Sequence, residues 1–370
     1  MLVYVCISAH GFGHGSRQGA ILSALHKLQP HWRLVISTSL PNTFLKLAMG
    51  GVLFEKRLCN WDVGIIQPSA IEADNEATSR ALDTLENNLP LQVECESRWL
   101  RFQQDSILIV SDIPPAAASL ARELNAPLVW IGNFGWDDIY SYIGKSFRDK
   151  TQKIRDSYYQ GTCLIRLPFS MAMDWSLPEI QVGLTTSEPR LNLQNLGKLI
   201  GWHEIPERKY TILIGFGGLK LNDIHCQIFD NWKNYHFLIR GIEKHISMEN
   251  WPKNVSFLPA NIRLLDFMPL CSRMLTKPGY SSFCEAISQG LGLHVVNREG
   301  FAEVEVLERG LKAAGYYRFL GPLQFKLGEW ELNHMLNTPF SSIPIDGADQ
   351  AAWALVAIAN KVNQNRFILK

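Results

Sequence analysis

A glycine-rich turn near the start of the chain carries the first residues suited to chemistry. Residues 8–17 read Ser-Ala-His-Gly-Phe-Gly-His-Gly-Ser-Arg and follow a short apolar run. Glycines let the backbone turn tightly and approach a ligand closely. The free N–H groups of a helix that begins here would favour an anion or a developing negative charge. We predict that His14 takes a proton from a hydroxyl group, since histidine exchanges protons near neutral pH. The alternative is that His14 caps the turn.

Two neighbours of His14 are predicted to contact the same substrate. Gly13 offers close approach of its backbone. Arg17 either holds a phosphate at the binding site or pairs with an acid of the protein. The spacing G-x-G-x-G matches neither the dinucleotide motif G-x-G-x-x-G nor a P-loop, so the turn is assigned to neither class.

Polar residues among aromatic ones follow two later strands of the first half. Ser111-Asp112 ends one strand, and Asn133-Phe134-Gly135-Trp136-Asp137 follows the next. Such clusters suit a sugar-like molecule, whose faces stack while its hydroxyls form hydrogen bonds. We predict acceptor contacts for Asn133, Trp136 and Asp137, and we take Asp112 as the alternative base to His14. Asp137 has a second interpretation, as the cap of the following helix.

The second half of the chain carries residues suited to a nucleotide diphosphate. The predicted donor-binding set is Gly217, Gly218, Lys277, Gly279, Ser281, Ser282, Glu285 and Glu303. Its glycines and serines lie where strands lead into helices and can donate hydrogen bonds to phosphate. Lys277 adds positive charge, Glu285 is expected on the ribose, and Glu303 on the donor sugar. The alternative for Glu303 is a solvated position in the first turn of a helix, where acids are favoured.

Short apolar runs must position these residues. We predict strands at 2–7, 34–37, 106–110, 128–131 and 163–167, and a second series at 210–215, 236–239, 255–258, 273–275 and 293–296. The intervening helices are expected at 16–27, 74–88, 91–103, 116–124, 137–159, 223–232, 281–289, 304–309 and 348–362. Continuous apolar strands between helices indicate parallel sheets covered on both faces, and therefore an α/β fold. A polar stretch with prolines, within residues 181–208, separates the two series.

The composition excludes several classes of protein. Hydrophobic residues make up 46%, charged residues 19%, and the net charge is +1, which argues against disorder and gives no basis for nucleic-acid binding. Seven widely spaced cysteines without a C-x-x-C pair indicate free thiols rather than disulfides or a zinc site. No apolar stretch approaches the ~20 residues of a membrane span, and no signal peptide is evident. We therefore expect a cytoplasmic protein.

Taken in order, these motifs resemble GT-B glycosyltransferases, especially the glycosyltransferase-like N-terminal region of L-arabinokinases. The matching elements are Gly11-Phe12-Gly13-His14, Asp62-Val63-Gly64 with Gln67, Ser111-Asp112, Asn133-Phe134-Gly135-Trp136-Asp137, Arg166-Leu167-Pro168, Lys277-Pro278-Gly279-Tyr280, Glu285-Ala286, and Phe301 with Glu303. The Asn-Phe-x-Trp-Asp cluster is the most specific. The Pro-Gly and Glu-Ala elements are similar to those of the N-acetylglucosaminyltransferase that makes lipid II and of plant secondary-metabolite glycosyltransferases. The kinase half of arabinokinases has no counterpart in this sequence.

The resemblance implies two Rossmann-like domains that face each other across a cleft. Residues 1–190 would bind the acceptor, residues 191–347 the nucleotide-sugar, with UDP expected, and residues 348–370 would pack back on the first domain. Gln67 joins the predicted acceptor contacts.

The implied reaction is transfer of a sugar to a hydroxyl with inversion, without a metal ion or cofactor. Two alternatives stay open, namely a non-catalytic nucleotide-sugar-binding module and a UDP-sugar epimerase of the same fold. Trp136, Tyr140 and Tyr142, taken as exposed aromatics, suit a lipid-linked acceptor and peripheral contact with the inner membrane face.

Overall fold

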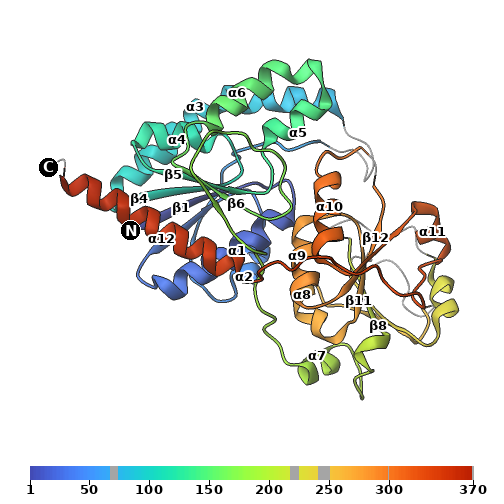
Figure 1. The fold of residues 1–370 in the computed structure, drawn as a ribbon. Helices are drawn as coiled ribbons and strands as arrows, with labels where there is room; N and C mark the ends of the chain where they lie inside the picture. The colour runs from blue at the N-terminus through green and yellow to red at the C-terminus, as the bar shows by residue number, and fades with distance from the viewer. Residues whose placement is uncertain (67–73, 217–224, 241–250, 299, 369–370) are drawn as a thin grey trace. The chain divides into compact units, whose positions relative to one another are not determined.

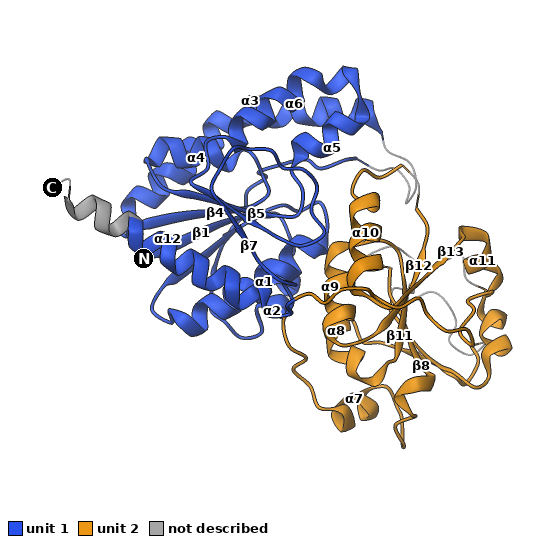
Figure 2. Cartoon of the chain, viewed as in Figure 1, with its two compact units in different colours: residues 1–186, 344–370 blue, residues 187–343 orange. Residues whose placement is uncertain are grey.

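The computed structural model describes residues 1–66, 74–216, 225–240, 251–298 and 300–368. The chain divides into two units, Met1–Thr186 with Pro344–Lys370, and Ser187–Ile343. Figure 2 draws unit 1 in blue and unit 2 in orange. In each unit, helices pack against a parallel sheet (Figure 1).

Unit 1 is built on a seven-stranded parallel sheet in the order β3-β2-β1-β4-β5-β6-β7. Its strands are β1 (Leu2–Ile7), β2 (Arg33–Ser37), β3 (Glu55–Arg57), β4 (Ile107–Asp112), β5 (Leu128–Gly132), β6 (Cys163–Arg166) and β7 (Glu179–Gln181). Every residue of β1 is buried, which explains its unbroken apolar sequence, since both faces of a parallel sheet are covered. The chain builds outward from β1 to β3, then from β4 to β7 on the other side. Consequently β1 and β4 are neighbours, and Ile7 pairs with Asp112.

The helices of unit 1 connect these strands. They are α1 (Phe12–Leu28), α2 (Asn42–Met49), α3 (Asn75–Phe102), α4 (Ala117–Leu124), α5 (Trp136–Ile143), α6 (Arg148–Tyr158) and α12 (Gly347–Ile368). The last of them, α12, lies along α1 (Figure 1). Its first residue, Gly347, donates its N–H to the carbonyl of Leu184 at 3.1 Å, and Leu184 donates to that of Pro344 at 2.8 Å. The segments that leave unit 1 and return to it are therefore hydrogen-bonded to each other.

Tyr158 ties the core of unit 1 to two of its loops. Its ring stacks on Trp175 with centroids 3.9 Å apart. Its hydroxyl donates to the carbonyl of Ile113 at 2.8 Å and accepts from the N–H of Trp136 at 3.0 Å. These two partners lie just beyond β4 and β5, so one buried side chain fixes both loops at the carboxyl edge of the sheet.

Unit 2 repeats the plan with six parallel strands in the order β10-β9-β8-β11-β12-β13. They are β8 (Thr211–Ile214), β9 (His236–Ile239), β10 (Val255–Phe257), β11 (Arg273–Thr276), β12 (Gly292–Val296) and β13 (Tyr317–Leu320). Its α-helices are α7 (Leu193–Leu199), α8 (Leu264–Phe267), α9 (Tyr280–Ser288), α10 (Val304–Ala314) and α11 (Pro322–Leu327). Phe229, Phe237 and Trp330 are fully buried at its core. Here β8 and β11 are the neighbours at which the direction of building reverses.

Several predicted elements differ from the structure for local reasons. The helices expected at 74–88 and 91–103 form one helix, α3, which continues through Pro90 because Val93, Ser97 and Leu100 beyond it are buried. The helix expected at 137–159 is broken at Gly144, whose φ of 108° no other residue adopts readily. A 3₁₀ helix, Cys226–Trp232, lies in the region where 223–232 was expected to be an α-helix.

Candidate functional site

The predicted site residues lie at the points where sheet building reverses. Neighbouring strands whose connections leave in opposite directions open a crevice at their carboxyl ends, and ligands of open α/β sheets bind there. In unit 1 this point lies between β1 and β4. His14 follows β1, and Asp112 is the last residue of β4. In unit 2 it lies between β8 and β11, after which Lys277 and Gly279 follow.

His14 and Asp112, named as alternative bases, form one hydrogen-bonded pair. His14 lies in the first turn of α1, and its Nδ1 is 2.9 Å from Oδ1 of Asp112. A carboxylate can only accept, so Nδ1 carries the hydrogen in this bond and Nε2 is the basic nitrogen. No partner of Nε2 is present among the described residues. Asp112 is fully buried and His14 is 8% exposed, which leaves His14 as the member that reaches the crevice.

Arg17 forms two hydrogen bonds with the Asp112 carboxylate. Its Nε donates to Oδ2 of Asp112 at 2.7 Å, its Nη2 donates to Oδ1 and lies 3.0 Å from Nδ1 of His14, and its Nη1 donates to Oδ1 of Asn133 at 2.5 Å. Gln18 adds a bond from Nε2 to Oδ2 of Asp112 at 2.9 Å. Of the two interpretations of Arg17, the structure therefore contains the pair with an acid.

This arrangement keeps Asp112 ionised. Burial alone would raise the pKa of Asp112, but the charge and hydrogen bonds of Arg17, assisted by His14, outweigh it and lower the pKa to about 2. Arg17 is 2% exposed and Asn133 is fully buried. The predicted acceptor contacts of Arg17 and Asn133 thus need correction, because both side chains are enclosed and orient Asp112 instead.

The aromatic cluster after β5 is packed inside unit 1. Trp136 is 2% exposed and Tyr140 is 1% exposed, and their rings stack with centroids 5.6 Å apart. The expectation that Trp136 and Tyr140 present rings to an acceptor or a membrane is therefore wrong; residue type does not distinguish a core aromatic from a site aromatic. Tyr142 is exposed as expected. No helix among the described residues combines the length and apolarity needed to cross a membrane.

Asp137 is also enclosed. It lies in the first turn of α5, whose cap residue is Gly135, so Asp137 is not the cap. Its oxygens accept from Nε1 of Trp175 at 3.2 and 3.3 Å and from Nε of Arg155 at 3.3 Å. With 1% exposure, Asp137 anchors α5 to the core, which corrects its prediction as an acceptor contact.

A further carboxyl, that of Asp62, lies at the carboxyl edge of this sheet and is not among the predicted site residues. It follows β3, and its Oδ2 accepts from Nε1 of Trp136 at 2.8 Å. Two residues later Gly64 has φ +72°, and a Cβ there would lie 2.2 Å from Nδ1 of His10. The Asp62-Val63-Gly64 element is part of the resemblance to GT-B glycosyltransferases, and it is the feature of the sequence that could have identified Asp62 as a site residue. Gly13 is partly exposed in the first turn of α1, and Gln67 lies outside the described residues.

The donor residues of unit 2 surround the start of α9. Gly279 precedes its first turn, in which Ser281 and Ser282 are half-buried. Lys277 is half-buried before it; desolvation and the charge of Arg298 lower its pKa to about 8, while Glu303 opposes them. Glu303 is the residue immediately before α10. Gly217 and Gly218 lie outside the described residues.

Glu285 lies in the second turn of α9 with its carboxyl only partly exposed. No described residue forms a hydrogen bond with that carboxyl. Burial raises its pKa to about 7, with Asp266 adding to the effect and Arg263 and Arg240 opposing it. A carboxyl in this state gains stability from any ligand that donates hydrogen bonds to its charged form.

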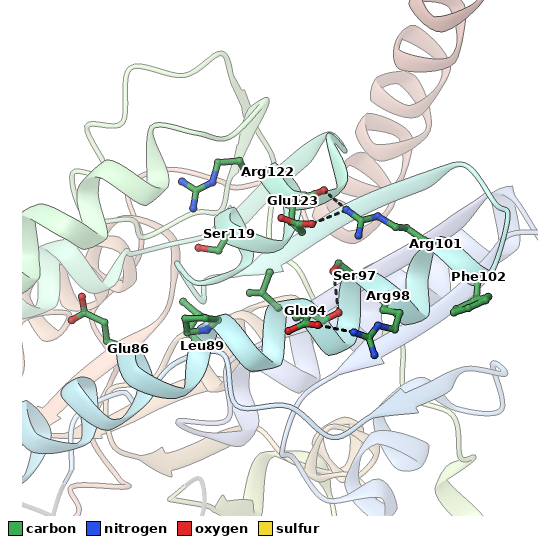
Figure 3. A pocket seen from close by; sticks show the side chains of 12 residues that line it. Glu86, Leu89, Glu94, Ser97, Arg98, Arg101, Phe102, Ser119, Arg122 and Glu123 are labelled. Carbon is green, nitrogen blue, oxygen red and sulfur yellow. Dashed lines mark hydrogen bonds and ion pairs between the residues drawn. The ribbon is translucent and has the colours of Figure 1, made fainter.

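A hollow on the surface of unit 1 lies apart from the candidate site. It has a volume of about 710 Å³ and lies between α3 and α4 (Figure 3). Its charges are largely paired, as in Arg98–Glu94 at 2.6 Å and Arg101–Glu123 at 2.7 Å, and its lining contains none of the described site residues. Among the described residues, no three His, Cys, Asp or Glu side chains come together as metal ligands.

Comparison with known sequences gives a distant match. No protein-family model matches the chain. The chain is 25% identical over 313 residues to L-arabinokinase of Arabidopsis thaliana. The match covers 83% of this chain but 29% of the arabinokinase, so the chain spans less than a third of that protein's length.

Solved structures define the fold. The chain is similar to the glycotransferase of kitacinnamycin, with TM-score 0.57, 12% identity and 98% of both chains covered. It is also similar to UGT89C1 of Arabidopsis thaliana complexed with UDP, with TM-score 0.60, 13% identity and coverage of 97% of this chain and 90% of that one. A UDP-glucosyltransferase of Polygonum tinctorium gives TM-score 0.60, 14% identity and coverage of 97% and 98%. These are GT-B glycosyltransferase structures, and the chain has the GT-B fold, as predicted.

Proposed function

We propose that the chain is a glycosyltransferase that moves a sugar from a UDP-sugar to a hydroxyl group of a small-molecule acceptor. The observation that carries this proposal is the His14–Asp112 pair at the reversal point of the first sheet, with Nε2 of His14 directed away from Asp112. Fold-level analogy supports it, since UGT89C1 has been solved with UDP, UDP-L-rhamnose and quercetin.

His14 acts as the general base. Nδ1 donates to Asp112, and Nε2 accepts the hydroxyl proton as the acceptor oxygen bonds to the anomeric carbon of the donor sugar. Asp112 stabilises the imidazolium that forms, and it stays ionised because Arg17 holds its pKa near 2. The bond between the anomeric carbon and the diphosphate oxygen breaks, and UDP leaves with the electron pair. Direct attack of this kind inverts the anomeric configuration.

Unit 2 would hold the donor. The N–H groups at the start of α9, with the hydroxyls of Ser281 and Ser282 and the charge of Lys277, stabilise the departing diphosphate. Glu285 accepts hydrogen bonds from ribose hydroxyls, and Glu303 from the donor sugar. Gly217 and Gly218 belong to the same proposal through the sequence alone. Backbone and side-chain donors of this kind make the reaction independent of a metal ion.

The test is turnover of isotope-labelled UDP-sugar by a His14→Ala variant. Removing a general base costs about 10²–10⁴-fold in rate, so transfer should fall by at least about 10²-fold while UDP affinity stays within about two-fold. The matched control is His31→Ala, which removes an exposed histidine beyond α1. Unchanged transfer by His14→Ala, or an equal loss in the control, would overturn the assignment.

Two other functions remain candidates for the same fold. A nucleotide-sugar-binding module would bind UDP-sugar without transferring the sugar to any acceptor. The match to L-arabinokinase favours this function, because it covers only 29% of a protein whose name describes a different reaction, phosphorylation. An epimerase would convert one UDP-sugar to another without an acceptor, which NMR of the reaction mixture distinguishes. We place the protein in the cytoplasm, because its seven cysteines are free thiols and most are buried.

A further inference from the structure

The loop of residues 60–66 is fixed by side chains from several elements. Trp61 is buried, and its Nε1 donates to Oγ of Ser37 at 2.7 Å. Trp136 donates to the Asp62 carboxyl at 2.8 Å, and the hydroxyl of Tyr140 donates to the carbonyl of Gly64 at 2.9 Å. The loop therefore holds Asp62 in one place rather than leaving it free to move.

That place adjoins the His14–Asp112 pair. Ser8, the residue after β1, donates its N–H to the carbonyl of Asp112 at 2.8 Å. Burial raises the pKa of Asp62, and the hydroxyl of the same Ser8 opposes this by forming a hydrogen bond with the charged carboxylate. Asp62 also interacts electrostatically with both His14 and Asp112. Three strands thus bring Asp62, His14 and Asp112 to the carboxyl edge of one sheet from positions far apart in the sequence.

The Asp62 carboxyl has acceptor capacity left for a ligand. An ionised carboxylate offers about four lone-pair sites. Trp136 and Ser8 account for two of them, and no described cation forms an ion pair with Asp62. Arg17, the nearby buried guanidinium, is committed to Asp112 and Asn133. Asp62 is partly exposed, whereas Asp112 is closed off, so the two carboxylates have different tasks.

We propose that Asp62 binds a second hydroxyl of the acceptor, next to the hydroxyl that His14 deprotonates, so that the acceptor is a sugar or another polyol. This inference rests on the proposed glycosyl transfer and narrows its acceptor. A polyol donates one hydroxyl to Nε2 of His14 and a neighbouring hydroxyl to Asp62. An acceptor with one hydroxyl leaves the Asp62 charge unsatisfied in a partly dehydrated crevice, which disfavours its binding.

Asp62→Asn tests the charge with little change of shape, because the amide oxygen can still accept from Trp136. L-Arabinose, D-glucose and glycerol serve as polyol probes, and benzyl alcohol and 4-nitrophenol as single-hydroxyl probes. A hydrogen bond to a charged group contributes about 1.5–3 kcal/mol, so kcat/KM for the polyols should fall about 10–100-fold. Transfer to the single-hydroxyl probes should fall clearly less than transfer to the polyols, because those probes lose only the electrostatic effect of Asp62 on His14 and no hydrogen bond. Equal losses for both probe classes, or no loss for the polyols, would overturn the proposal.

A binding measurement separates this inference from the proposed function. The indole N–H of Trp136 donates to Asp62, so its NMR resonance, identified with Trp136→Phe, reports directly on that carboxyl. In the wild-type protein L-arabinose should shift this resonance, and benzyl alcohol should not. The shift should be lost in Asp62→Asn. If the wild type transfers sugar to no probe but the shift occurs, glycosyl transfer is wrong and the Asp62 polyol site stands. If L-arabinose produces no shift up to its solubility limit, the Asp62 site is wrong.

Discussion

Glu285 provides a prediction in which stability and ligand binding change in opposite directions. The carboxyl is partly buried in α9, and its pKa is about 7 against an ordinary value of 4.5. The folded protein therefore keeps a proton that the unfolded chain has already lost between about pH 4.5 and about pH 7. Folding stability falls as pH rises through this window, and the loss is complete above it.

The expected size follows from the shift. One pKa unit corresponds to 1.36 kcal/mol, so a shift from 4.5 to about 7 gives an upper bound of about 3 kcal/mol at pH 8. Since the carboxyl is partly exposed, solvent screening reduces this, and we expect about 1–2 kcal/mol. Glu285→Gln removes the charge and should stabilise the protein by that amount at pH 8. It should have little effect at pH 4.5, where the wild-type carboxyl is mostly protonated.

Urea unfolding of unit 2, followed by amide hydrogen exchange in β11 and β12, measures this at both pH values. The control is Glu329→Gln, an exposed glutamate of the same unit. In parallel, UDP affinity should fall about 10–100-fold in Glu285→Gln, because ribose hydroxyls lose a charged acceptor. The affinity of the wild-type protein for UDP should rise with pH up to about 7, as Glu285 loses its proton. The variant lacks this carboxyl, so any rise in its affinity reports the titration of UDP itself and is subtracted. A variant no more stable than wild type at pH 8 would refute the reasoning about burial.

Three further predictions concern unit 1 and the donor chemistry. Asp112→Asn should reduce transfer by at least about 10²-fold. It should also destabilise unit 1 by about 3–5 kcal/mol in urea unfolding, because it leaves Arg17 as an uncompensated buried charge. In the wild type, the stability from this pair is fully present above pH 3.8 and should be lost as pH falls through about 2. Gly64→Ala should destabilise unit 1 by about 1–3 kcal/mol, since φ is +72° and the new Cβ meets the His10 ring; an unchanged melting temperature would contradict the strained fit. Transfer should persist after treatment with EDTA and dialysis, and a loss restored by Mg²⁺ or Mn²⁺ would rule out the metal-independent mechanism.

Most strands could be predicted because buried parallel strands are unbroken apolar runs. The 2–7 run matches β1 residue for residue. The strands β3, β7 and β13 were missed because they lie at sheet edges and carry charge, as in Glu55-Lys56-Arg57, Glu179-Ile180-Gln181 and Tyr317-Arg318-Phe319-Leu320. Pro90 suggested an interruption that packing of the residues beyond it overrides. Propensity acts locally, and burial decides the outcome where the two conflict.

The site was predictable in its residues but not in its connections. His14 and Asp112 were recognisable from strand ends, but their bond spans 98 positions and depends on the pairing of Ile7 with Asp112. Whether Arg17 would face a ligand or an acid depended on that same register. Trp136 was assigned to the acceptor because aromatic residues suit sugars and cores alike; the Asp62 loop folding over it determines that it is enclosed.

The return of α12 to unit 1 affects the order in which the chain can fold during synthesis. Residues 187–343 are contiguous and can fold once they have left the ribosome, whereas the unit made first stays incomplete. Ala351, Ala352 and Leu355 of α12 are buried, and α12 packs along α1, which is synthesised long before α12. A stop codon at residues 344–346 would thus leave unit 2 whole but remove α12 from unit 1. Unit 1 is therefore completed only after the whole of unit 2 has been synthesised.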